Sequence, residues 1–459
     1  MSGTPPRPLP PRPERPRRLV ALVDCSAFYC SCERAFRPDL ATTPVVVLSN
    51  NDGCVISRTA EAKALGVPMG APYFKVRRQL DRDGVAVFSS NYALYADLSR
   101  RVMEVLEQFT PDVERSSIDE AFLTLRADAA QPEAERERLE ALAHAIRDAV
   151  LRATGVPVRV SIAETKTLAK AASEYSRGRG GAVCFWGHPA RDAFLGALPV
   201  EDVWGIGPRW ARRLRSEGVT TAAAFAALDD RRLRRHYNVT ALRTAWELRG
   251  VPCVAAEGAT PRRSLVRSRS FGERTARLDL ALEAVATHAA RAAEKLRAEG
   301  LEAGALQVFL TTGGHGPGPH RQGSAMLPFT HPTASTFTVV GLARQLLRSC
   351  HVAEDRAGRP LRYLKVGVVL TELAPCGPAQ SDLFTPRAAE HPALLAAVDR
   401  LNARFGRHTV AVAAQGHPAR LARIETAETG TPAWAMRREH MSPRYTTAWD
   451  ALPVIRLVA

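Results

Sequence analysis

Short apolar runs alternate with helical patterns along residues 19–185, and this alternation constrains the fold more than any other feature of the chain. The runs 19–23 and 44–48 predict buried strands, because each is short, apolar and followed by polar or turn-forming residues. Residues 92–109 have the spacing of an amphipathic helix, and residues 132–154 predict a charged helix. Since this order of strands and helices allows antiparallel pairing, we expect an α+β fold here.

Two further folded units follow. Residues 186–255 have little strand pattern and predict a small helical domain, in which the glycine turn Gly205-Ile206-Gly207 joins two short helices. Residues 256–264 are a basic linker that contains Gly and Pro. Strand and helix patterns then occur in the order β-α-β-β-α-β over residues 265–373. We therefore expect a second, smaller α+β domain near the C-terminal end.

Charge favours a polyanionic partner. Lys and Arg number 63 against 47 acidic residues, which gives a formal net charge of +16. Nucleic acid is the usual partner of such a chain, and a solvated basic surface is the alternative. Residues 1–18 hold seven prolines and five arginines and predict a disordered basic arm. Residues 374–459 predict a loop-rich, weakly patterned tail.

Length and cysteine content narrow the class of protein. A chain of 459 residues exceeds what one hydrophobic core usually serves, so two to four domains are expected. The eight cysteines include no CxxC pair and fit neither a zinc site nor a disulfide scaffold, which favours a reducing cytosol. No run of about 18 apolar residues occurs, so we predict no membrane span.

Three acidic residues stand out by their context. Asp24 ends a strand that is predicted to be buried, where an unpaired carboxylate is costly. Asp119 and Glu120 are adjacent in a predicted turn, so both side chains can face one point. A cluster of three carboxylates would bind two divalent cations, which is the arrangement that in-line phosphoryl transfer uses. The alternative is that Asp24 caps the following helix and that Asp119-Glu120 is a surface turn.

Several long segments carry a resemblance to a known family. They are VVVLSNNDGCVISR, AEAKALGVPMG, FSSNYALYADLSRRVM, SIDEAF, ALPVEDVWGIG, RSFGER and MSPRYTT. In these segments the chain resembles the Y-family translesion DNA polymerases, and among them the UmuC-type catalytic subunits of bacterial DNA polymerase V. The match runs from about residue 19 to residue 456.

The resemblance implies a two-metal active site. Asp24, Asp119 and Glu120 fall at the positions of the family's metal-binding triad, which holds two Mg²⁺ ions. The backbone carbonyl of Cys25 would complete the shell of one metal ion.

The resemblance also implies contacts with the incoming nucleotide. Phe28 and Tyr29 would lie beneath the deoxyribose, with the ring of Tyr29 as the steric gate that excludes a 2′-hydroxyl. Ser57, Lys63 and Arg177 fall at positions that hold the triphosphate. Lys63 stands where many members have Arg, and Arg177 where many have Lys. Since Arg and Lys are not interchangeable at such contacts, this part of the implied site departs from the family pattern.

The implied architecture is a right hand. Residues 19–185 would form the palm, with fingers inserted at about 28–89. Residues 186–255 would form the thumb with a helix-hairpin-helix, and residues 265–373 the little finger.

Contacts with DNA are expected from the thumb and from the start of the little finger. Gly205 and Gly207 let backbone N–H groups approach a phosphate without obstruction from side chains. By resemblance, a cluster of arginines would follow the duplex backbone. These residues are Arg262, Arg263, Arg267 and Arg269.

The resemblance implies protein partners as well. Gln380-Ser381-Asp382-Leu383-Phe384 resembles the pentapeptide that binds the sliding clamp, with Gln380, Leu383 and Phe384 as its contact residues. Relatives of this type act with a dimer of the cleaved UmuD subunit and with a RecA filament. We therefore expect a bacterial, cytoplasmic and nucleoid-associated protein.

The function expected from these features is error-prone translesion synthesis in the SOS response to DNA damage. The enzyme would add dNTPs to a primer 3′ end opposite damaged bases. One alternative is a catalytically inactive scaffold that recruits another polymerase to the clamp. A second is a nucleotidyl cyclase with similar two-metal chemistry, which the basic thumb and the clamp-like pentapeptide disfavour.

Overall fold

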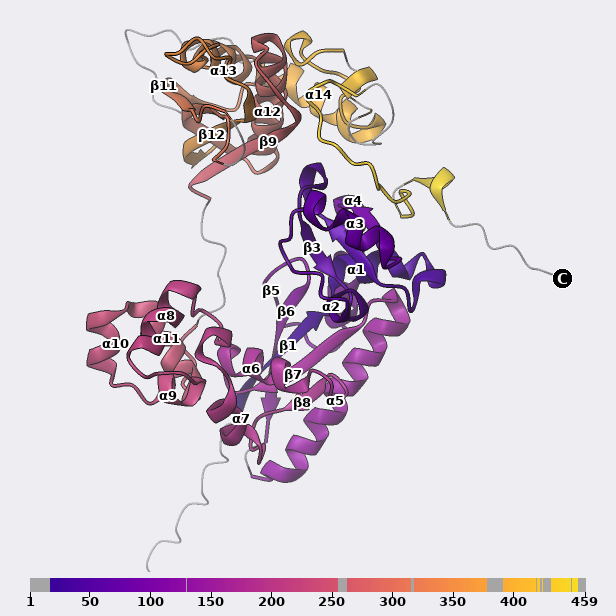
Figure 1. Ribbon diagram of the computed structural model, residues 1–459, viewed down its shortest axis with the longest axis vertical. Helices are drawn as coiled ribbons and strands as arrows, with labels where there is room; N and C mark the ends of the chain where they lie inside the picture. Colours follow the sequence, from indigo (N-terminus) through magenta and orange to yellow (C-terminus); the bar gives the residue numbers. More distant parts are fainter. Residues whose placement is uncertain are drawn as a thin grey trace, which may run out of the picture.

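A computed structural model describes most of the chain (Figure 1). The described residues are 17–128, 130–254, 262–314, 318–377, 391–417, 419–421, 423, 431–446 and 448–452. The predicted clamp-binding residues Gln380, Leu383 and Phe384 lie outside them, as do residues 1–16 and most of the predicted linker. Within the described residues, no helix has both the length and the apolar character that a membrane span requires.

A five-stranded sheet in the order β5-β6-β1-β7-β8 forms the first unit. Its strands are β1 (Arg17–Cys25), β5 (Val113–Arg115), β6 (Glu120–Ala127), β7 (Val158–Ala163) and β8 (Ala182–Cys184). The central strand β1 pairs antiparallel with β6 on one side and with β7 on the other. The predicted α+β class is confirmed, and the acidic residue Asp24 lies near the end of the central strand.

Helices cover both faces of this sheet. Helices α4 (Tyr92–Leu106) and α5 (Pro132–Thr154) pack on one face, where Ala21 and Val23 join the core. Helix α6 (Lys166–Ser176) packs on the other face against Leu22 and Phe122. Because successive residues of a strand point to opposite faces, Asp24 and Glu120 continue the rows of Leu22 and Phe122 and lie on the α6 side.

The expected fingers contain a separate three-stranded sheet in the order β3-β2-β4. Strand β2 (Val45–Leu48) pairs antiparallel with β3 (Val55–Arg58) and parallel with β4 (Ala86–Ser89). The helical elements of this part are α1 (Phe28–Ala35), η1 (Pro38–Leu40), η2 (Asn50–Asp52), α2 (Ala60–Ala64) and α3 (Tyr73–Arg82). Val46, Leu48 and Leu80 belong to a small core of its own.

The expected thumb is helical throughout. Its elements are α7 (Arg191–Ala197), η3 (Val200–Asp202), α8 (Pro208–Ser216), α9 (Ala222–Ala226), α10 (Asp230–His236) and α11 (Val239–Leu248). Gly205 has a φ of +93° in the turn before α8, a conformation that favours glycine. The thumb core is continuous with the α6 face of the palm, since Leu168 and Leu248 belong to the same cluster.

The expected little finger is an antiparallel sheet covered by two helices. Its elements are β9 (Ser264–Thr275), α12 (Leu278–Ala298), β10 (Leu301–Thr311), β11 (Gln322–Thr333), α13 (Thr336–Cys350) and β12 (Tyr363–Pro375). The strand order is β11-β10-β12-β9, so β9 is an edge strand. The β-α-β-β-α-β order expected from the sequence is the order that the structure shows.

The C-terminal region is more regular than expected. A loop-rich tail was predicted, but α14 (Pro392–Phe405) is a helix of 14 residues, and η4 (Ala413–Gln415) and η5 (Trp449–Ala451) follow it. Helix α14 packs beside the little finger, where Arg297 of α12 donates two hydrogen bonds of 2.7 Å to Asp399. Leu394, Val398, Leu401 and Phe405 have the i, i+4, i+7, i+11 spacing of a helix, so the sequence carried a helical signal that the prediction did not use.

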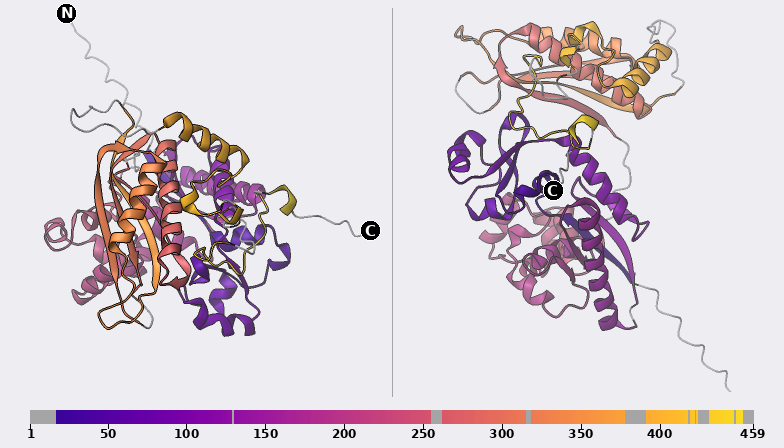
Figure 2. Two further views of the ribbon diagram at one scale, coloured as in Figure 1. Left: turned by 90° about the horizontal axis from the view of Figure 1, so that it is seen from above. Right: turned by 90° about the vertical axis from the view of Figure 1, so that its right-hand side faces the viewer.

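Residues 431–446, here called the C-terminal segment, run between the little finger and the fingers (Figure 2). The Ser89 N–H of β4 donates to the His440 carbonyl at 2.9 Å, and the His440 N–H donates to the Ser89 hydroxyl at 3.0 Å. The Asn51 side chain accepts from the Arg437 N–H at 3.0 Å. The other end of Asn51 donates to the Phe271 carbonyl of β9 at 3.0 Å. A single asparagine of the fingers therefore contacts both the little finger and the C-terminal segment.

Candidate active site

The three predicted carboxylates come together at one end of the palm sheet. Asp24 of β1 lies directly opposite Glu120 of β6 in the antiparallel register. The next residue, Cys25, donates its backbone N–H to the carbonyl of Asp119 at 2.9 Å. Directly opposed residues have Cβ atoms about 4.5–5.5 Å apart. The pairing places the Asp119-Glu120 turn beside Asp24. Helix α1 has Ala27 at its N-cap and no side-chain cap, so the alternative role of Asp24 as a helix cap is wrong.

Basic side chains and a hydroxyl accompany the acids. Arg159, which lies opposite Asp24 on β7, donates to the Asp24 carboxylate. Lys170 of α6 donates to Glu120 Oε1 at 2.5 Å. Asp119 accepts from the Ser117 hydroxyl at 2.5 Å. Both ion pairs are largely shielded from water, with 16–25% of each side chain exposed, so they are stronger than surface pairs.

The pKa of the buried Cys25 thiol depends on the charges around it. Burial raises the pKa of Cys25, and the negative charges of Asp119, Asp24 and Glu120 raise this pKa further. All three carboxylates therefore lie within electrostatic range of one atom at the end of β1.

The carboxylates are paired with basic residues in this structure. Among the described residues, no group of three or more His, Cys, Asp or Glu side chains is placed so that it could hold a metal ion. Instead, Arg159 and Lys170 neutralise two of the three acids. Carboxylates are preferred ligands of Mg²⁺, and two divalent ions would relieve the same repulsion that the two basic residues relieve here.

An aromatic group lies beside the acids at the start of α1. The ring of Tyr29 stacks on Tyr95 of α4 with centroids 4.5 Å apart, and Tyr92 meets Tyr29 edge-on at 6.1 Å. Burial raises the pKa of Tyr29, with smaller effects from Tyr92 and from Asp119. Phe28 is buried in the palm core, 5.8 Å from the Tyr29 ring. The flat, fixed ring of Tyr29 thus lies within range of the carboxylates.

Comparison with known families and relatives agrees with this geometry. Residues 23–174 match the impB/mucB/samB family, and residues 262–383 match the impB/mucB/samB family C-terminal domain. Protein UmuC of Salmonella typhimurium is 41% identical over 444 residues, which cover 95% of this chain and 99% of that protein. The chain belongs to the impB/mucB/samB family.

Other relatives extend the comparison. Protein MucB of Escherichia coli is 38% identical over 95% of this chain and 99% of that protein. DNA polymerase IV of Caulobacter vibrioides is 28% identical over 84% of this chain and 91% of that protein. As a UmuC-type homologue of the Y-family DNA-directed DNA polymerases, the protein takes part in translesion synthesis and damage-induced mutagenesis. Homology to these enzymes implies metal-dependent catalysis.

Solved structures agree on the fold. The Y-family DNA polymerase chimera Dbh-Dpo4(243-245)-Dbh is similar with a TM-score of 0.60 and 23% identity, over 77% of this chain and 98% of that chain. Residues 392–455, which include α14, match a domain of unknown function, DUF4113.

The expected triphosphate contacts of the impB/mucB/samB family lie on three different elements. Ser57 of β3 is 5% exposed, and its hydroxyl accepts from the Cys30 backbone N–H at 3.5 Å. Lys63 of α2 is exposed. Arg177 follows the last residue of α6 and donates to Glu174 at 2.8 Å. Lys63 is therefore exposed to solvent and Arg177 is paired with Glu174, whereas Ser57 is buried against helix α1.

The predicted DNA contacts divide into two groups. Arg262 and Arg263 are exposed before β9, and Arg262 pairs with Glu299 at 3.1 Å. Arg267 and Arg269 lie in β9 and line a cavity together with His288 of α12. The second pair therefore faces the helix-covered side of the sheet. Gly207 immediately precedes α8 and has no side chain to cap the helix, so its first N–H groups stay accessible.

Sequence reasoning missed the basic residues of the site. Arg159 is the single charge in the apolar strand β7, and this interruption of the pattern was a usable signal. Lys166 and Lys170 are four residues apart, a spacing that places both on one side of α6. Lys166 donates to Glu114 at 2.6 Å. Helix α6 therefore forms two lysine–glutamate pairs, since Lys170 pairs with Glu120.

A buried polar network behind Tyr29 was also missed. The hydroxyl of Tyr95 donates to Glu33 at 2.7 Å, and the Glu33 side chain is fully buried. Burial raises the pKa of Glu33 to about 7. Asn91, which caps α4, donates to the Ser442 hydroxyl of the C-terminal segment at 3.0 Å. The stacking partner of Tyr29 is therefore fixed by groups that lie next to the C-terminal segment.

Proposed function

We propose that the protein adds dNTPs to a primer 3′ end opposite damaged template bases, and that Asp24, Asp119 and Glu120 hold two Mg²⁺ ions for this reaction. The observation that carries the proposal is the register that opposes Asp24 and Glu120, with the Cys25–Asp119 main-chain bond beside it. Three carboxylates in one place would be costly in a protein that had no cation to bind.

Residues of the chain would hold the ions in a defined way. The Asp24 and Glu120 carboxylates would turn from Arg159 and Lys170 towards the metal ions, and the Cys25 carbonyl would complete one shell. The bound ions would stabilise the attacking and leaving oxygens of the phosphoryl transfer. Arg159 and Lys170 would then no longer be paired with the carboxylates. Their positive charges would lie at the edge of the site, near the negative charge of the triphosphate.

Sugar selection would belong to Tyr29. Its ring is held between Tyr92 and Tyr95, so it can exclude a 2′-hydroxyl without moving. Phe28, packed beneath it in the core, would support the floor of the sugar pocket. Lys63 and Arg177 would contact the triphosphate, and Ser57 would support the same wall.

The thumb and the residues before β9 would hold the duplex. The thumb range 199–250 contains ten arginines against six acidic residues. The N–H groups at the start of α8 would meet one phosphate, and Arg262 and Arg263 would meet others.

Protein partners are proposed from the resemblance. Gln380, Leu383 and Phe384 would bind the sliding clamp, and the chain would act with a cleaved UmuD-type dimer and a RecA filament. This would take place in the bacterial cytoplasm at the nucleoid.

Primer extension past a template abasic site tests the proposal. The protein is assayed with Mg²⁺ and dNTPs, with and without the cleaved dimer and the RecA filament. Extension past the lesion in either condition supports translesion synthesis. If neither the undamaged nor the abasic template is extended in any condition, the catalytically inactive clamp-binding scaffold is the better assignment.

A further inference from the structure

A small cavity lies on the helix side of the little finger. Its volume is about 90 Å³, and it is bounded by the edge strand β9, helix α12, the residues after α14 and the C-terminal segment. A buried water needs only a small part of such a volume, so a tetrahedral oxyanion can enter. The residues that line it are Arg267, Ser268, Arg269, Thr287, His288, Arg291, His408 and Trp434.

The lining carries positive charge and no carboxylate. The side chains of Arg267 and Arg269 each lack an ion-pair or hydrogen-bond partner among the described residues, although the charge of Glu294 acts on Arg267 from further away. Arg291 lies 3.7 Å from Glu294, one turn further along α12, but Glu294 does not line this cavity. Unpaired arginines that share a half-buried space repel one another unless an anion joins them.

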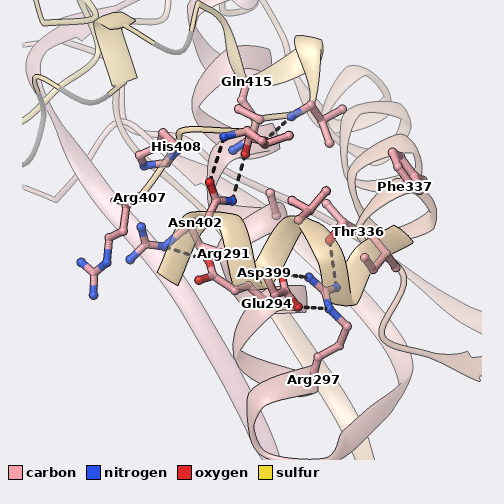
Figure 3. A pocket seen from close by; sticks show the side chains of 16 residues that line it. Arg291, Glu294, Arg297, Thr336, Phe337, Asp399, Asn402, Arg407, His408 and Gln415 are labelled. Atoms are coloured by element: carbon pink, nitrogen blue, oxygen red, sulfur yellow. Dashed lines mark hydrogen bonds and ion pairs between the residues drawn. The ribbon is translucent and has the colours of Figure 1, made fainter. Parts of the chain in front are cut away.

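A neighbouring cavity provides a contrast (Figure 3). It has a volume of about 120 Å³, lies between α12 and α14, and shares Arg291 and His408 with the first. There the acidic residues Asp399 and Glu294 are part of the lining, and Asp399 accepts both hydrogen bonds of the Arg297 fork. The neighbouring cavity therefore has two carboxylates against three arginines, Arg291, Arg297 and Arg407, whereas the first cavity has three arginines and no carboxylate.

Trp434 supplies the most specific observation. Its side chain is only 5% exposed, and its indole Nε1–H is buried without an acceptor. A buried N–H that lacks a partner loses the hydrogen bond it would make with water, so such groups are rare in native proteins. The tryptophan is held in place because the segment packs on β9, where a Cβ at Gly272 would come within 2.5 Å of the Ala435 carbonyl.

His288 completes the wall opposite Trp434. Its ring is 7% exposed and meets the Trp434 ring edge-on with centroids 6.2 Å apart. Burial lowers the pKa of His288 to about 3, and the charges of Arg269, Arg267 and Arg291 lower it further. The imidazole is therefore neutral and can offer a hydrogen bond without adding to the repulsion.

We propose that this cavity binds a phosphate group, with the guanidinium groups of Arg267 and Arg269 and the indole N–H of Trp434 as donors. A phosphate offers several acceptor oxygens to a site that contains mostly donors. The bound phosphate would join β9, α12 and the C-terminal segment. This segment lies within the part of the chain that matches the domain of unknown function. The ligand would be a small phosphate ion or the terminal phosphate of a nucleotide, since the Trp434 donor is out of reach of the outer surface.

Phosphate binding to the full-length protein tests the proposal. The protein is purified in chloride buffer, and inorganic phosphate or dATP is titrated at constant ionic strength and followed by calorimetry and by thermal unfolding. We expect saturable binding of one phosphate per chain and a rise in Tm that chloride at the same ionic strength does not produce. Only the binding that Arg267→Gln removes is compared between the two ligands. If dATP binds more tightly than inorganic phosphate in this comparison, the ligand is the terminal phosphate of a nucleotide. If the two bind equally, the ligand is the free phosphate ion.

Variants make the test specific. Arg267→Gln and Trp434→Phe should each weaken phosphate binding by at least about tenfold, because each removes a donor, while Trp434→Phe keeps the ring. Arg356→Gln removes an exposed arginine of a distant loop and should bind like the wild type. Unchanged Tm in chloride would verify that the variants fold, and Arg267→Lys should restore part of the affinity.

Three outcomes would overturn the proposal. The first is a Tm that responds equally to phosphate and to chloride. The second is phosphate binding that Arg267→Gln and Trp434→Phe leave unchanged. The third is competition, in which a short unphosphorylated duplex displaces phosphate from the wild type to the extent that the duplex binds. Arg267, Arg269 and Trp434 would then belong to the surface that binds duplex DNA.

Discussion

Asp24 and Glu120 face each other across adjacent antiparallel strands, with Arg159 opposite Asp24 on its other side. Like charges in directly opposed positions destabilise a sheet. The structure compensates with Arg159 and with Lys170, which reaches Glu120 from helix α6. Such a costly arrangement is retained at sites that bind cations, and its consequences can be measured.

Magnesium should stabilise the protein through these carboxylates. At a Mg²⁺ concentration about ten to a hundred times the Kd, we expect a gain of about 1.4–2.7 kcal/mol in the free energy of unfolding. Asp24→Asn should abolish most of this gain, because it removes one charged ligand. Thermal unfolding with Mg²⁺, compared with Na⁺ at equal ionic strength, measures the effect without any assay of activity. An equal response of Asp24→Asn and wild type would exclude Asp24 as a ligand.

Tyr29→Ala should relax sugar discrimination. Removing the ring opens the space that a 2′-hydroxyl needs, so we expect ribonucleotide incorporation relative to dNTP to rise by about 10- to 100-fold. Tyr29→Phe keeps the ring stacked on Tyr95 and should retain discrimination. The ratio of kcat/KM for the two nucleotide types measures this. If Tyr29→Ala discriminates as well as the wild type, another residue forms the gate.

Glu33 predicts a pH dependence of stability. Burial raises the pKa of Glu33 to about 7, above its ordinary value of 4.5. A native carboxyl that keeps its proton contributes stability below pH 4.5, and this contribution is lost as the pH rises to about 7. The loss amounts to about 3 kcal/mol at most.

Glu33→Gln should remove this dependence, because glutamine still accepts from Tyr95 but cannot ionise. Urea unfolding at pH 5 and pH 8 measures this. The free energy of unfolding of the variant, relative to that of the wild type, should be higher at pH 8 than at pH 5. Parallel behaviour of the two proteins would mean that Glu33 is charged in the native state at both pH values.

Binding of DNA should depend strongly on salt. If the basic thumb and the arginines before β9 neutralise about 6–10 phosphates, the plot of log K against log salt should have a slope of about −5 to −9. The double variant Arg262→Gln/Arg263→Gln should make the slope less negative by about 2. Fluorescence anisotropy of a primer-template between 50 and 300 mM salt measures it, and a slope near zero would place the duplex elsewhere.

Much of the fold could be predicted because its local patterns are strong. Helix α5 was expected at its observed bounds, since Pro132 begins it and Gly155, with a φ of +70°, follows its end. The little finger was expected in the correct order for the same reason. Helix α14 was missed although Leu394, Val398, Leu401 and Phe405 have helical spacing, and three of these four side chains are exposed, so this stripe does not face a core. The contacts of the C-terminal segment with Asn51 and Asp52 of the fingers join residues more than 350 positions apart, and no local pattern encodes them.

The site divides in the same way. Asp24 stood out because it ends an apolar strand, and Asp119 and Glu120 because they are adjacent in a turn, while the metal-binding role of all three is implied by the resemblance. Their basic partners were not found, because a lysine on an amphipathic helix has the same local pattern whether it faces water or an acid. The cavity of Arg267, Arg269 and Trp434 depends on tertiary packing alone, so the sequence could only suggest a basic cluster.

The measurement that tests the central claim most directly is single-nucleotide primer extension under single-turnover conditions. It compares the wild type with Asp24→Asn and with Asp119→Ala/Glu120→Ala, and uses Glu104→Gln, an exposed glutamate of α4, as the matched control. We predict that the carboxylate variants extend at least about 100-fold more slowly while they still bind primer-template, and that the control extends normally. Extension by Asp119→Ala/Glu120→Ala at the rate of the wild type would contradict the account.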